Sequence, residues 1–325
     1  MELTANTMVG DDVKLERPLE AGGMGSVWVG RHLPTNHEVA VKFIHEELLE
    51  QEPTVLDRFE REASVLDKVR NPHIVKLFSR GTLDDGTPYI VMELVKGENF
   101  ADWLVRTEQW LSLEQVGVLL EQMAIALEPV HALKIVHRDI KGENVLLVGD
   151  ADELFIKVID FGCAKTPWLP GHPKLTAPGM LLGSPEYMSP EQIISAANVD
   201  HRTDLWAMSV VAYTAVTLTL PFRGETLGDV FAAIRFGKFT PASEERDSLP
   251  PAVDAWFAQA LAVNRDNRFA SAREMSDAWQ RAIAPEVISA PTDASPAPPG
   301  IPRSLAIALG IGLLIVLVVV AVVLM

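Results

Sequence analysis

Two short polar clusters constrain what this chain can fold into more than any other feature of its sequence. The first reads "HRDIKGEN" at residues 137–144 and lies between apolar segments. The second reads "DFG" at residues 160–162, and its aspartate follows Asp139 by 21 positions. Asp139 or Asp160, taken singly, can also be interpreted as a turn or capping residue. Together the clusters hold the residue types of a site that carries chemistry, so the rest of the chain is interpreted around them.

A glycine-rich stretch, "PLEAGGMGSVW", precedes these clusters at residues 18–28. Three glycines stand close together in it: Gly22, Gly23 and Gly25. The backbone N–H groups of such a loop can lie against a phosphate, because glycine has no side chain to hold the backbone away. Glu20 stands where a first glycine is expected. Since a glycine-rich turn between two strands is common, the stretch alone leaves a phosphate loop and an ordinary turn as alternatives.

Local patterns divide the chain into a smaller sheet-rich part and a larger helical part. Strands are indicated by β-branched, alternating side chains separated by turn signals, and helices by apolar residues at helical spacing. The predicted segments are strands at residues 26–33 and 37–44, a helix at 53–69, two strands within 73–95, and helices at 111–133 and 203–218. After Gly97 the pattern is mainly helical.

Composition limits the compartment and the partners of the chain. Cys163 is its single cysteine, which excludes internal disulfides and a cysteine-based zinc site and fits a reducing cytoplasm. The formal net charge of -16 argues against nucleic acid as a partner, because a basic face is missing. The first residues contain acids and no apolar run, so they do not form a secretory signal.

The C-terminal residues predict a membrane anchor. Leu305–Met325 contains no charged or strongly polar residue, and as a helix it would span roughly 32 Å, enough to cross a bilayer core of about 30 Å. The transmembrane helix is therefore expected at residues 304–325. Residues 285–303 are rich in proline and poor in apolar residues, which predicts an extended linker.

The order of the motifs is typical of one enzyme family. The pieces that match it are "GGMGSV", "VAVK", "REA", "YIVMELVKG", "HRDIKGEN", "DFG", "GSPEYMSPEQ", "DLWAMSV" and "NRDNRF". With these pieces in this order, the chain resembles a bacterial-type (Hanks-type) serine/threonine protein kinase. The resemblance covers residues 13–284, after an N-terminal tail of residues 1–12. It implies an α+β, two-lobed protein-kinase fold with a small β-rich N-lobe and a larger helical C-lobe.

The resemblance also implies roles for the polar residues around ATP. Lys42 would bind the α- and β-phosphates, and Glu62 would be the acid that fixes Lys42 in place. Asp160 would hold Mg²⁺, or alternatively Mn²⁺, against the phosphates, and Asn144 would provide a second metal contact. Asp139 and Lys141 complete the implied catalytic set. Asp139 would accept the proton of the attacking hydroxyl, and Lys141 would steady the γ-phosphate.

The implied nucleotide site has apolar walls and a main-chain edge. The residues that would enclose the adenine are Leu19, Val27, Ala40, Met92 and Leu146. Glu93 and Val95 would offer main-chain hydrogen bonds, and the glycines of the loop at 22–25 would cover the phosphates. Without the resemblance, the apolar residues of this set can be interpreted simply as core.

The segment between Asp160 and Glu191 is expected to bind the protein substrate and to regulate the enzyme. Arg138, next to Asp139, implies control by a phosphate in this segment. The available hydroxyls are Thr166, Thr176 and Ser184, of which Thr176 is the leading phosphosite. Glu191 is expected to form a buried ion pair with Arg268.

Three residues depart from the pattern of the family. They are Glu20 in the glycine-rich loop, Gly142 in place of a proline, and Ser209 in place of a glycine. Because none of them removes a group that touches metal or phosphate, a membrane-anchored serine/threonine kinase with autophosphorylation is the expected function. A catalytically weak or silent kinase-like membrane scaffold is the alternative.

The expected cellular arrangement follows from the C-terminal anchor. A single pass through the cell membrane would leave the kinase domain in the cytoplasm, in agreement with the basic residues on the N-terminal side of the helix. Protein substrates and the lipid bilayer are the expected partners. Small residues spaced along the span allow close helix pairing, which leaves a homodimer as an open alternative.

Overall fold

The computed structural model describes residues 3–22, 25–45, 48–49, 54–149, 154–160, 184–195 and 198–284. The chain separates into two compact units, Met1–Ala284 and Pro285–Met325. The second unit, with the predicted linker and the predicted span at 304–325, lies outside the described residues. Within the described part of the chain, no helix is both long enough and apolar enough to cross a membrane.

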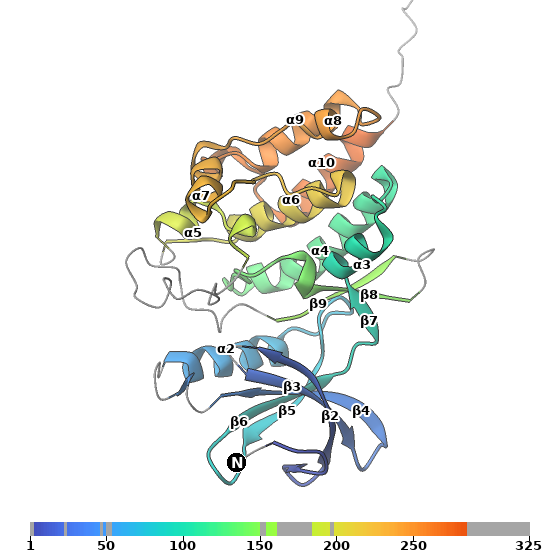
Figure 1. Ribbon diagram of the computed structural model, residues 1–325, viewed down its shortest axis with the longest axis vertical. Coiled ribbons are helices and arrows are strands. Elements are labelled where there is room, and N and C mark those ends of the chain that lie inside the picture. The colour runs from blue at the N-terminus through green and yellow to red at the C-terminus, as the bar shows by residue number, and fades with distance from the viewer. Residues whose placement is uncertain are drawn as a thin grey trace, which may run out of the picture. The chain divides into compact units, whose positions relative to one another are not determined.

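The first unit begins with a six-stranded antiparallel sheet (Figure 1), whose strand order is β1-β2-β3-β4-β6-β5. Its strands are β1 (Met8–Val9), β2 (Val13–Gly22), β3 (Gly25–His32), β4 (His37–Ile44), β5 (Leu77–Thr82) and β6 (Pro88–Glu93). The predicted strands at 26–33, 37–44 and within 73–95 are all confirmed. Val9 of β1 is buried, so this strand extends the sheet into the residues taken as a tail.

Strand β4 directs alternate side chains to the two faces of the sheet, as the period of two requires. Val39, Val41 and Phe43 pack into a separate outer cluster, while Ala40 belongs to the main core that continues into the helical part. Lys42 has the parity of Ala40. It therefore lies on the face of the sheet that is turned toward the helices.

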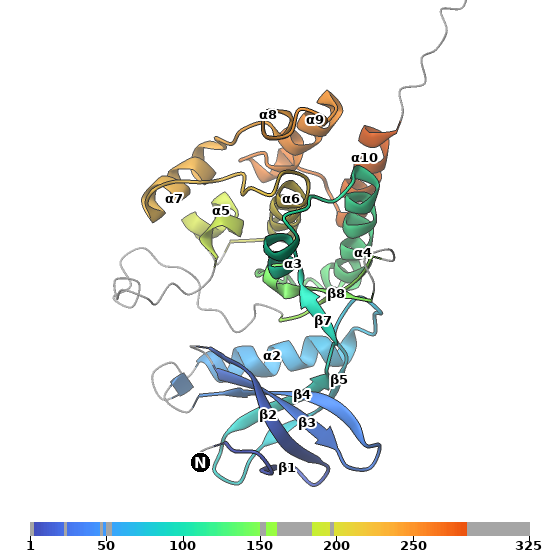
Figure 2. The same cartoon turned by 45° about the vertical axis from the view of Figure 1, so that its right-hand side comes forward.

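Helix α2 (Thr54–Lys68) lies across this same face (Figure 1 and Figure 2). Val55, Phe59 and Ala63 pack against Ile44 of β4 and Ile90 of β6. These helix positions form one stripe at the spacing of an amphipathic helix, and Glu62, seven residues after Val55, falls on the same stripe. The helix thus carries a carboxylate into the interior, which only a charged partner makes tolerable.

The larger part of the unit is helical. Its α-helices are α3 (Phe100–Thr107), α4 (Leu113–Ala132), α5 (Pro190–Ile194), α6 (Arg202–Thr217), α7 (Leu227–Phe236), α8 (Ala242–Glu245), α9 (Pro251–Ala260) and α10 (Ala272–Ile283). Helix α6 is the central one, because every residue of it except Arg202 and Thr214 is buried. Helices α4 and α6 confirm the helices predicted at 111–133 and 203–218.

A small second sheet positions the loop at 137–144 and Asp160. It has the order β7-β8-β9 and is built from β7 (Gly97–Asn99), β8 (Val145–Val148) and β9 (Phe155–Val158). Strands β8 and β9 pair antiparallel, with Leu147 opposite Ile156. The 3₁₀ turn η1 (Gly142–Asn144) leads into β8, and Asp160 follows β9 by two residues. The hairpin therefore brings Asp160 close to the loop at 137–144, although 21 positions separate it from Asp139 in sequence.

Candidate active site

Lys42 forms the centre of the candidate site. Its Nζ lies 3.0 Å from Oε1 of Glu62 and 2.8 Å from Oδ1 of Asp160. These partners come from three separate elements, because Lys42 belongs to β4, Glu62 to α2 and Asp160 to the segment after β9. The sequence predicted the pairing of Lys42 with Glu62, and the structure places the two in contact.

Burial and charge oppose each other in this triad. Burial acts against the charge on Lys42, but the carboxylates of Asp160 and Glu62 outweigh it and hold the pKa of Lys42 above its usual value. Burial raises the pKa of Glu62 to about 7, although the Lys42 ammonium acts in the opposite direction. Glu62 is 2% exposed, and its Oε2 has no hydrogen-bond partner among the described residues. Its ionised form is therefore held mainly by Lys42.

The loop at 137–144 places Asp139 and Asn144 side by side. Asn144 Nδ2 donates to the main-chain oxygen of Asp139 and to its Oδ2, both at 2.7 Å. Asn144 is 5% exposed and closes η1, which fixes its amide. Lys141 precedes η1 and is half-buried. The sequence predicted roles for all three residues, and the structure holds them on one short loop that ends in η1.

A buried aspartate, for which the motifs implied no role, holds this loop through hydrogen bonds to its backbone. Asp204 of α6 is fully buried, and its Oδ2 and Oδ1 accept hydrogen bonds from the backbone N–H groups of His137 and Arg138, at 2.9 and 2.8 Å. His131 Nε2 lies 2.8 Å from the same Oδ2. Burial alone would raise the pKa of Asp204, but these donors hold it below its usual value.

Arg138 shows why such support is needed. Its φ is +69°, in the left-handed region that non-glycine residues rarely adopt. Strain of this kind persists only where the surroundings enforce it. The hydrogen bond from the Arg138 amide to Asp204 supplies that constraint, so Asp204 is a positioning residue for the loop. The only sequence signal for it was its place in "DLWAMSV".

The predicted adenine walls separate into a buried set and a peripheral set. Ala40 and Met92 are paired opposite each other in the sheet and belong to the main core, with Val27 packed against it. Val95, predicted to offer a main-chain hydrogen bond, also packs against this core. Leu19 in β2 is 50% exposed and lies at the margin. The last predicted member, Leu146, is half-buried in β8 opposite Lys157.

The glycine-rich loop joins β2 to β3. Gly22 and Gly25 are paired opposite each other, whereas Gly23 lies outside the described residues. A Cβ on Gly25 would collide with the main-chain oxygen of Phe43 in β4, so this position requires glycine for strand packing as well. His45 donates a ring hydrogen bond of 3.1 Å to the Gly22 carbonyl, which ties the loop to the end of β4.

Residues 93–96 link β6 to β7, and we call them the hinge. An ion pair that the sequence gave no signal for joins this hinge to the second sheet. Lys157 of β9 lies 3.0 Å from Oε2 of Glu93, the last residue of β6. The Glu93 carboxylate also accepts the amide of Lys76 at 3.2 Å. The side chain of Glu93 is therefore occupied, and its backbone N–H donates to the Lys76 carbonyl at 2.8 Å. The Glu93 carbonyl is the main-chain group that remains for the adenine edge that the resemblance implies.

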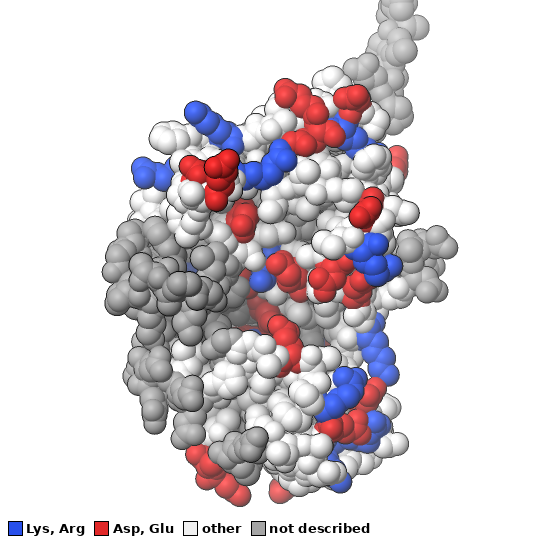
Figure 3. All heavy atoms as spheres, viewed as in Figure 1, with Lys and Arg blue, Asp and Glu red and all other residues white. Residues whose placement is uncertain are grey.

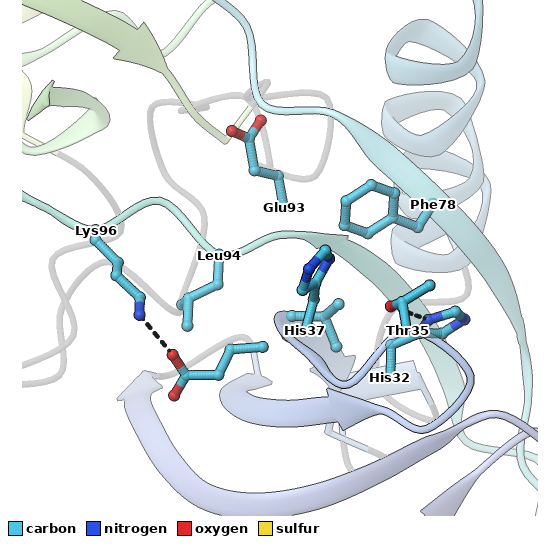
Figure 4. Close-up of a pocket in the computed structure, with 9 residues that line it drawn as sticks. His32, Thr35, His37, Phe78, Glu93, Leu94 and Lys96 are labelled. Atoms are coloured by element: carbon cyan, nitrogen blue, oxygen red, sulfur yellow. Dashed lines mark hydrogen bonds and ion pairs between the residues drawn. The ribbon is translucent and has the colours of Figure 1, made fainter.

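A pocket of about 530 Å³ lies beside this hinge (Figure 4). It is lined by residues that include His37, Val39, Phe78, Leu94 and Lys96, and Lys96 is paired with Glu38 at 2.8 Å. Val39 points to the face of β4 opposite to that of Ala40 and Lys42. This pocket therefore lies on the outer face of the sheet, and it shares Glu93 with the candidate nucleotide site.

The three departures from the family pattern all fit the structure. Glu20 is an exposed strand residue opposite Val27, where nothing requires glycine. Ser209 is fully buried and donates its hydroxyl to the Leu205 carbonyl at 2.7 Å, so the added polar group is satisfied. Gly142 packs against Ala101 of α3, at the start of η1.

The predicted pair of Glu191 and Arg268 is confirmed. Two parallel hydrogen bonds of 2.8 and 2.9 Å join them, and the Arg268 side chain is fully buried. Burial opposes the charge on Glu191, but Arg268 holds the pKa of this carboxyl below its usual value. The phosphosite candidates Thr166 and Thr176 lie outside the described residues, while Ser184 is half-buried.

The first unit has a sheet lobe and a helical lobe. It contains a lysine–carboxylate triad and a loop with a paired Asp and Asn. These features define the two-lobed kinase class of fold. The family profile described as a protein kinase domain matches residues 13–280. The chain therefore belongs to the protein kinase family.

Named bacterial kinases are similar over most of the chain. Serine/threonine-protein kinase Pkn1 of Myxococcus xanthus is 35% identical over 275 residues, which are 84% of this chain and 38% of that protein. The serine/threonine-protein kinase PksC of Streptomyces coelicolor is 34% identical, over 85% of this chain and 50% of that protein. This chain thus spans half or less of the length of these relatives.

A solved structure agrees with the fold. The crystal structure of the Mycobacterium tuberculosis PknI kinase domain superposes with a TM-score of 0.67 at 25% identity. The match covers 87% of this chain and all of that domain.

Proposed function

We propose that this chain is a serine/threonine protein kinase that transfers the γ-phosphate of ATP to hydroxyl groups of proteins, including its own. The observation that carries the proposal is the contact of Lys42 with both Glu62 and Asp160. Phosphoryl transfer depends almost entirely on positioning and charge stabilisation. A lysine held between two carboxylates beside the Asp139–Asn144 pair supplies both.

The positions of the chain's own groups support the following roles. Lys42 binds the α- and β-phosphates, and Glu62 keeps its ammonium in place from the interior side. Asp139, whose carboxylate is oriented by Asn144, accepts the proton of the attacking hydroxyl. Lys141, on the same loop, steadies the γ-phosphate.

The residues present fit a divalent cation. Asp160 and Asn144 offer oxygen ligands, which Mg²⁺ prefers, and Mn²⁺ accepts the same donors. Because Asn144 Nδ2 donates to Asp139, its amide oxygen is the atom left for a metal. In the described part of the chain, no group of three His, Cys, Asp or Glu residues could hold a metal by itself. A cation bound here would neutralise phosphate charge and take its remaining ligands from the nucleotide.

The direct test uses the full chain purified in detergent. Incubated with Mg²⁺, γ-labelled ATP and a generic basic protein, it should label serine or threonine, and the label should disappear when the metal is chelated. Asp160→Asn should remove the label while the protein stays folded. Labelling that survives both chelation and Asp160→Asn would refute the proposed site.

The chain is also proposed to be anchored in the cell membrane by residues 304–325, with the kinase domain in the cytoplasm. The support is the uninterrupted apolar run from Leu305 and the basic Arg303 before it. Deletion of residues 304–325 should move the protein from the membrane pellet to the soluble fraction. A truncated protein that remains in the pellet would contradict the anchor.

A further inference from the structure

Glu20 adds a carboxylate to the glycine-rich stretch, at the position where the family pattern has its first glycine. It lies in β2, two residues before Gly22 at the end of that strand. A glycine here would present no side chain to a nucleotide. The carboxylate of Glu20 must instead lie either in solvent or against a ligand, and the pairing of the strands decides between the two.

Strand pairing fixes the face of the sheet on which Glu20 lies. Glu20 is paired with Val27 of β3, and Val27 is paired in turn with Lys42 of β4. Side chains of residues that are paired directly across two strands stand on the same face. Val27 packs against the main core, so this face is the one turned toward the helices. Glu20, Val27 and Lys42 thus form one row on the nucleotide side of the sheet.

The row leaves a gap between Glu20 and Lys42. Their backbones are about 9.5 Å apart, because neighbouring strands lie about 4.8 Å from each other and β3 stands between them. The Lys42 ammonium is already held by Glu62 and Asp160. An ion pair between Glu20 and Lys42 is therefore not formed, and the space between the two side chains is open to a ligand.

The Glu20 carboxylate has no partner of its own in the described part of the chain. Its side chain is exposed, and no described residue forms a hydrogen bond or ion pair with it. Glu16, earlier in the same strand, is paired with Arg31 at 2.5 Å. Figure 3 shows acidic side chains gathered across the middle of one molecular face, between the sheet and the helices. A donor for Glu20 must therefore come from water or from a bound ligand.

The sugar of a bound nucleotide would lie beside this row. The adenine is assigned to the wall that contains Ala40 and Met92, and the phosphates to Lys42. Ala40 and Lys42 are two residues apart on β4, about 6.6 Å along the strand. Because the ribose joins the base to the phosphates, it falls between these two levels, on the face that Glu20 shares.

The chemistry of the nucleotide leaves the ribose hydroxyls as the donors for Glu20. An ionised carboxylate accepts hydrogen bonds and donates none. Adenosine nucleotides offer donors at two places, the adenine amino group and the 2′- and 3′-hydroxyls. The amino group belongs to the base edge, where the Glu93 carbonyl remains to accept it. In dinucleotide-binding folds, an acidic residue accepts the ribose hydroxyl in the same way.

A polar side chain on the other side of the site is already engaged in the fold. Asn99 of β7 is paired with Leu146 of β8, which is one of the predicted adenine walls. Its Oδ1 accepts the backbone N–H of Asp102 at 2.8 Å, and its Nδ2 donates to Oδ2 of the same residue at 2.7 Å. The Asn99 amide thus caps helix α3, in contrast to the Glu20 carboxylate, which is exposed.

We propose that Glu20 accepts hydrogen bonds from the ribose hydroxyls of the bound nucleotide and thereby selects nucleotides that carry these hydroxyls. This inference rests on the kinase activity proposed above and concerns the nucleotide substrate of that activity. Glu20 is accordingly a specificity-determining residue, in a position where the family pattern has a glycine.

The experiment measures equilibrium binding of ADP and of 2′,3′-dideoxyADP to the full chain in detergent with Mg²⁺, by calorimetry. Neither nucleotide has a γ-phosphate, so no transfer interferes with the measurement. ADP should bind at least about tenfold more tightly, because hydrogen bonds to charged groups are the strong ones. Glu20→Ala should reduce this ratio to less than about threefold, by weakening the binding of ADP and not that of the dideoxy nucleotide.

Two further variants control for the substitution itself. Glu20→Gly, which restores the glycine of the family pattern, should lose the discrimination as Glu20→Ala does. Glu244→Ala, the same change at an exposed position of α8, should keep it in full.

Equal binding of the two nucleotides by the unaltered chain, or a ratio that survives Glu20→Ala, would overturn the inference. In either case, labelling of serine or threonine from ATP would still establish the kinase. An unaltered chain that binds neither nucleotide and transfers no phosphate would instead refute the proposed function, and this inference with it.

Discussion

Gly142 and Ala101 lie in direct contact where the catalytic loop meets helix α3. A Cβ built on Gly142 would lie 3.1 Å from the Cβ of Ala101 and 3.2 Å from its backbone nitrogen. Contacts of this length are tighter than side chains normally make, so neither residue can be enlarged without movement of the loop or the helix. Ala101 of α3 thus leaves no room at position 142 for the proline of the family pattern.

This contact predicts coupling between the two positions. Gly142→Ala should destabilise the protein by about 1–3 kcal/mol through overpacking, and it should also lower kcat because the loop carries Asp139. Ala101→Gly alone should cost about 1 kcal/mol of helix propensity. The double variant should be more stable than the sum of the two effects predicts, by at least about 0.5 kcal/mol. Urea unfolding of all four proteins measures this, and strict additivity would show that the Ala101 Cβ does not contribute to the overpacking.

The Lys42–Glu62 pair predicts that stability and activity can be separated. Lys42→Met should abolish transfer, and it should also destabilise the fold by about 3–5 kcal/mol because Glu62 is left buried without its partner. Adding Glu62→Gln should restore most of the lost stability, since the uncompensated charge is gone, but no activity. A double variant as unstable as Lys42→Met would argue against the buried pair as the source of the cost.

The same pair predicts a pH dependence. Because the pKa of Glu62 is raised to about 7, its carboxyl becomes protonated as the pH falls through 7, and the ion pair with Lys42 is lost. The kcat/KM for ATP should therefore fall from pH 8 toward pH 6. Glu62→Gln should have low activity without this acid limb. An unchanged limb in Glu62→Gln would assign it to another group.

We expect a substitution of Asp204 to lower the rate of transfer, although this buried residue touches no substrate. Asp204→Asn places an amide N–H₂ among donors from His131, His137 and Arg138, and at most one oxygen remains to accept them. The loop should lose its fixed geometry, and kcat should fall by at least about tenfold, with a smaller change in the KM for ATP. Steady-state kinetics separate kcat from the KM for ATP. An equally large change in both would indicate general unfolding.

Much of this site could be predicted because its residues occur in ordered motifs. Lys42, Glu62, Asp139 and Asn144 were each identified from the sequence, and the structure brings them into pairs. The strands and helices followed from alternation and helical spacing. The contacts of Asp204 and the Lys157–Glu93 pair could not be predicted from the sequence. They join residues that lie 64 or more positions apart. In addition, each of these side chains has an ordinary surface or capping interpretation. Gly142 could be recognised from the sequence as a departure from the family pattern. Its neighbour Ala101, which leaves no room for a larger side chain there, belongs to no motif.

The central claim is that Asp139 positions and deprotonates the attacking hydroxyl, and single-turnover phosphoryl transfer by Asp139→Asn tests it most directly. The variant should bind ATP and unfold at nearly the same temperature as the unaltered chain, because Asn144 still finds an acceptor at position 139. Its rate of transfer to a serine peptide should be lower by at least about 10²-fold, the usual worth of a positioned base. Transfer at an unchanged rate, with the same dependence on the metal, would contradict the account.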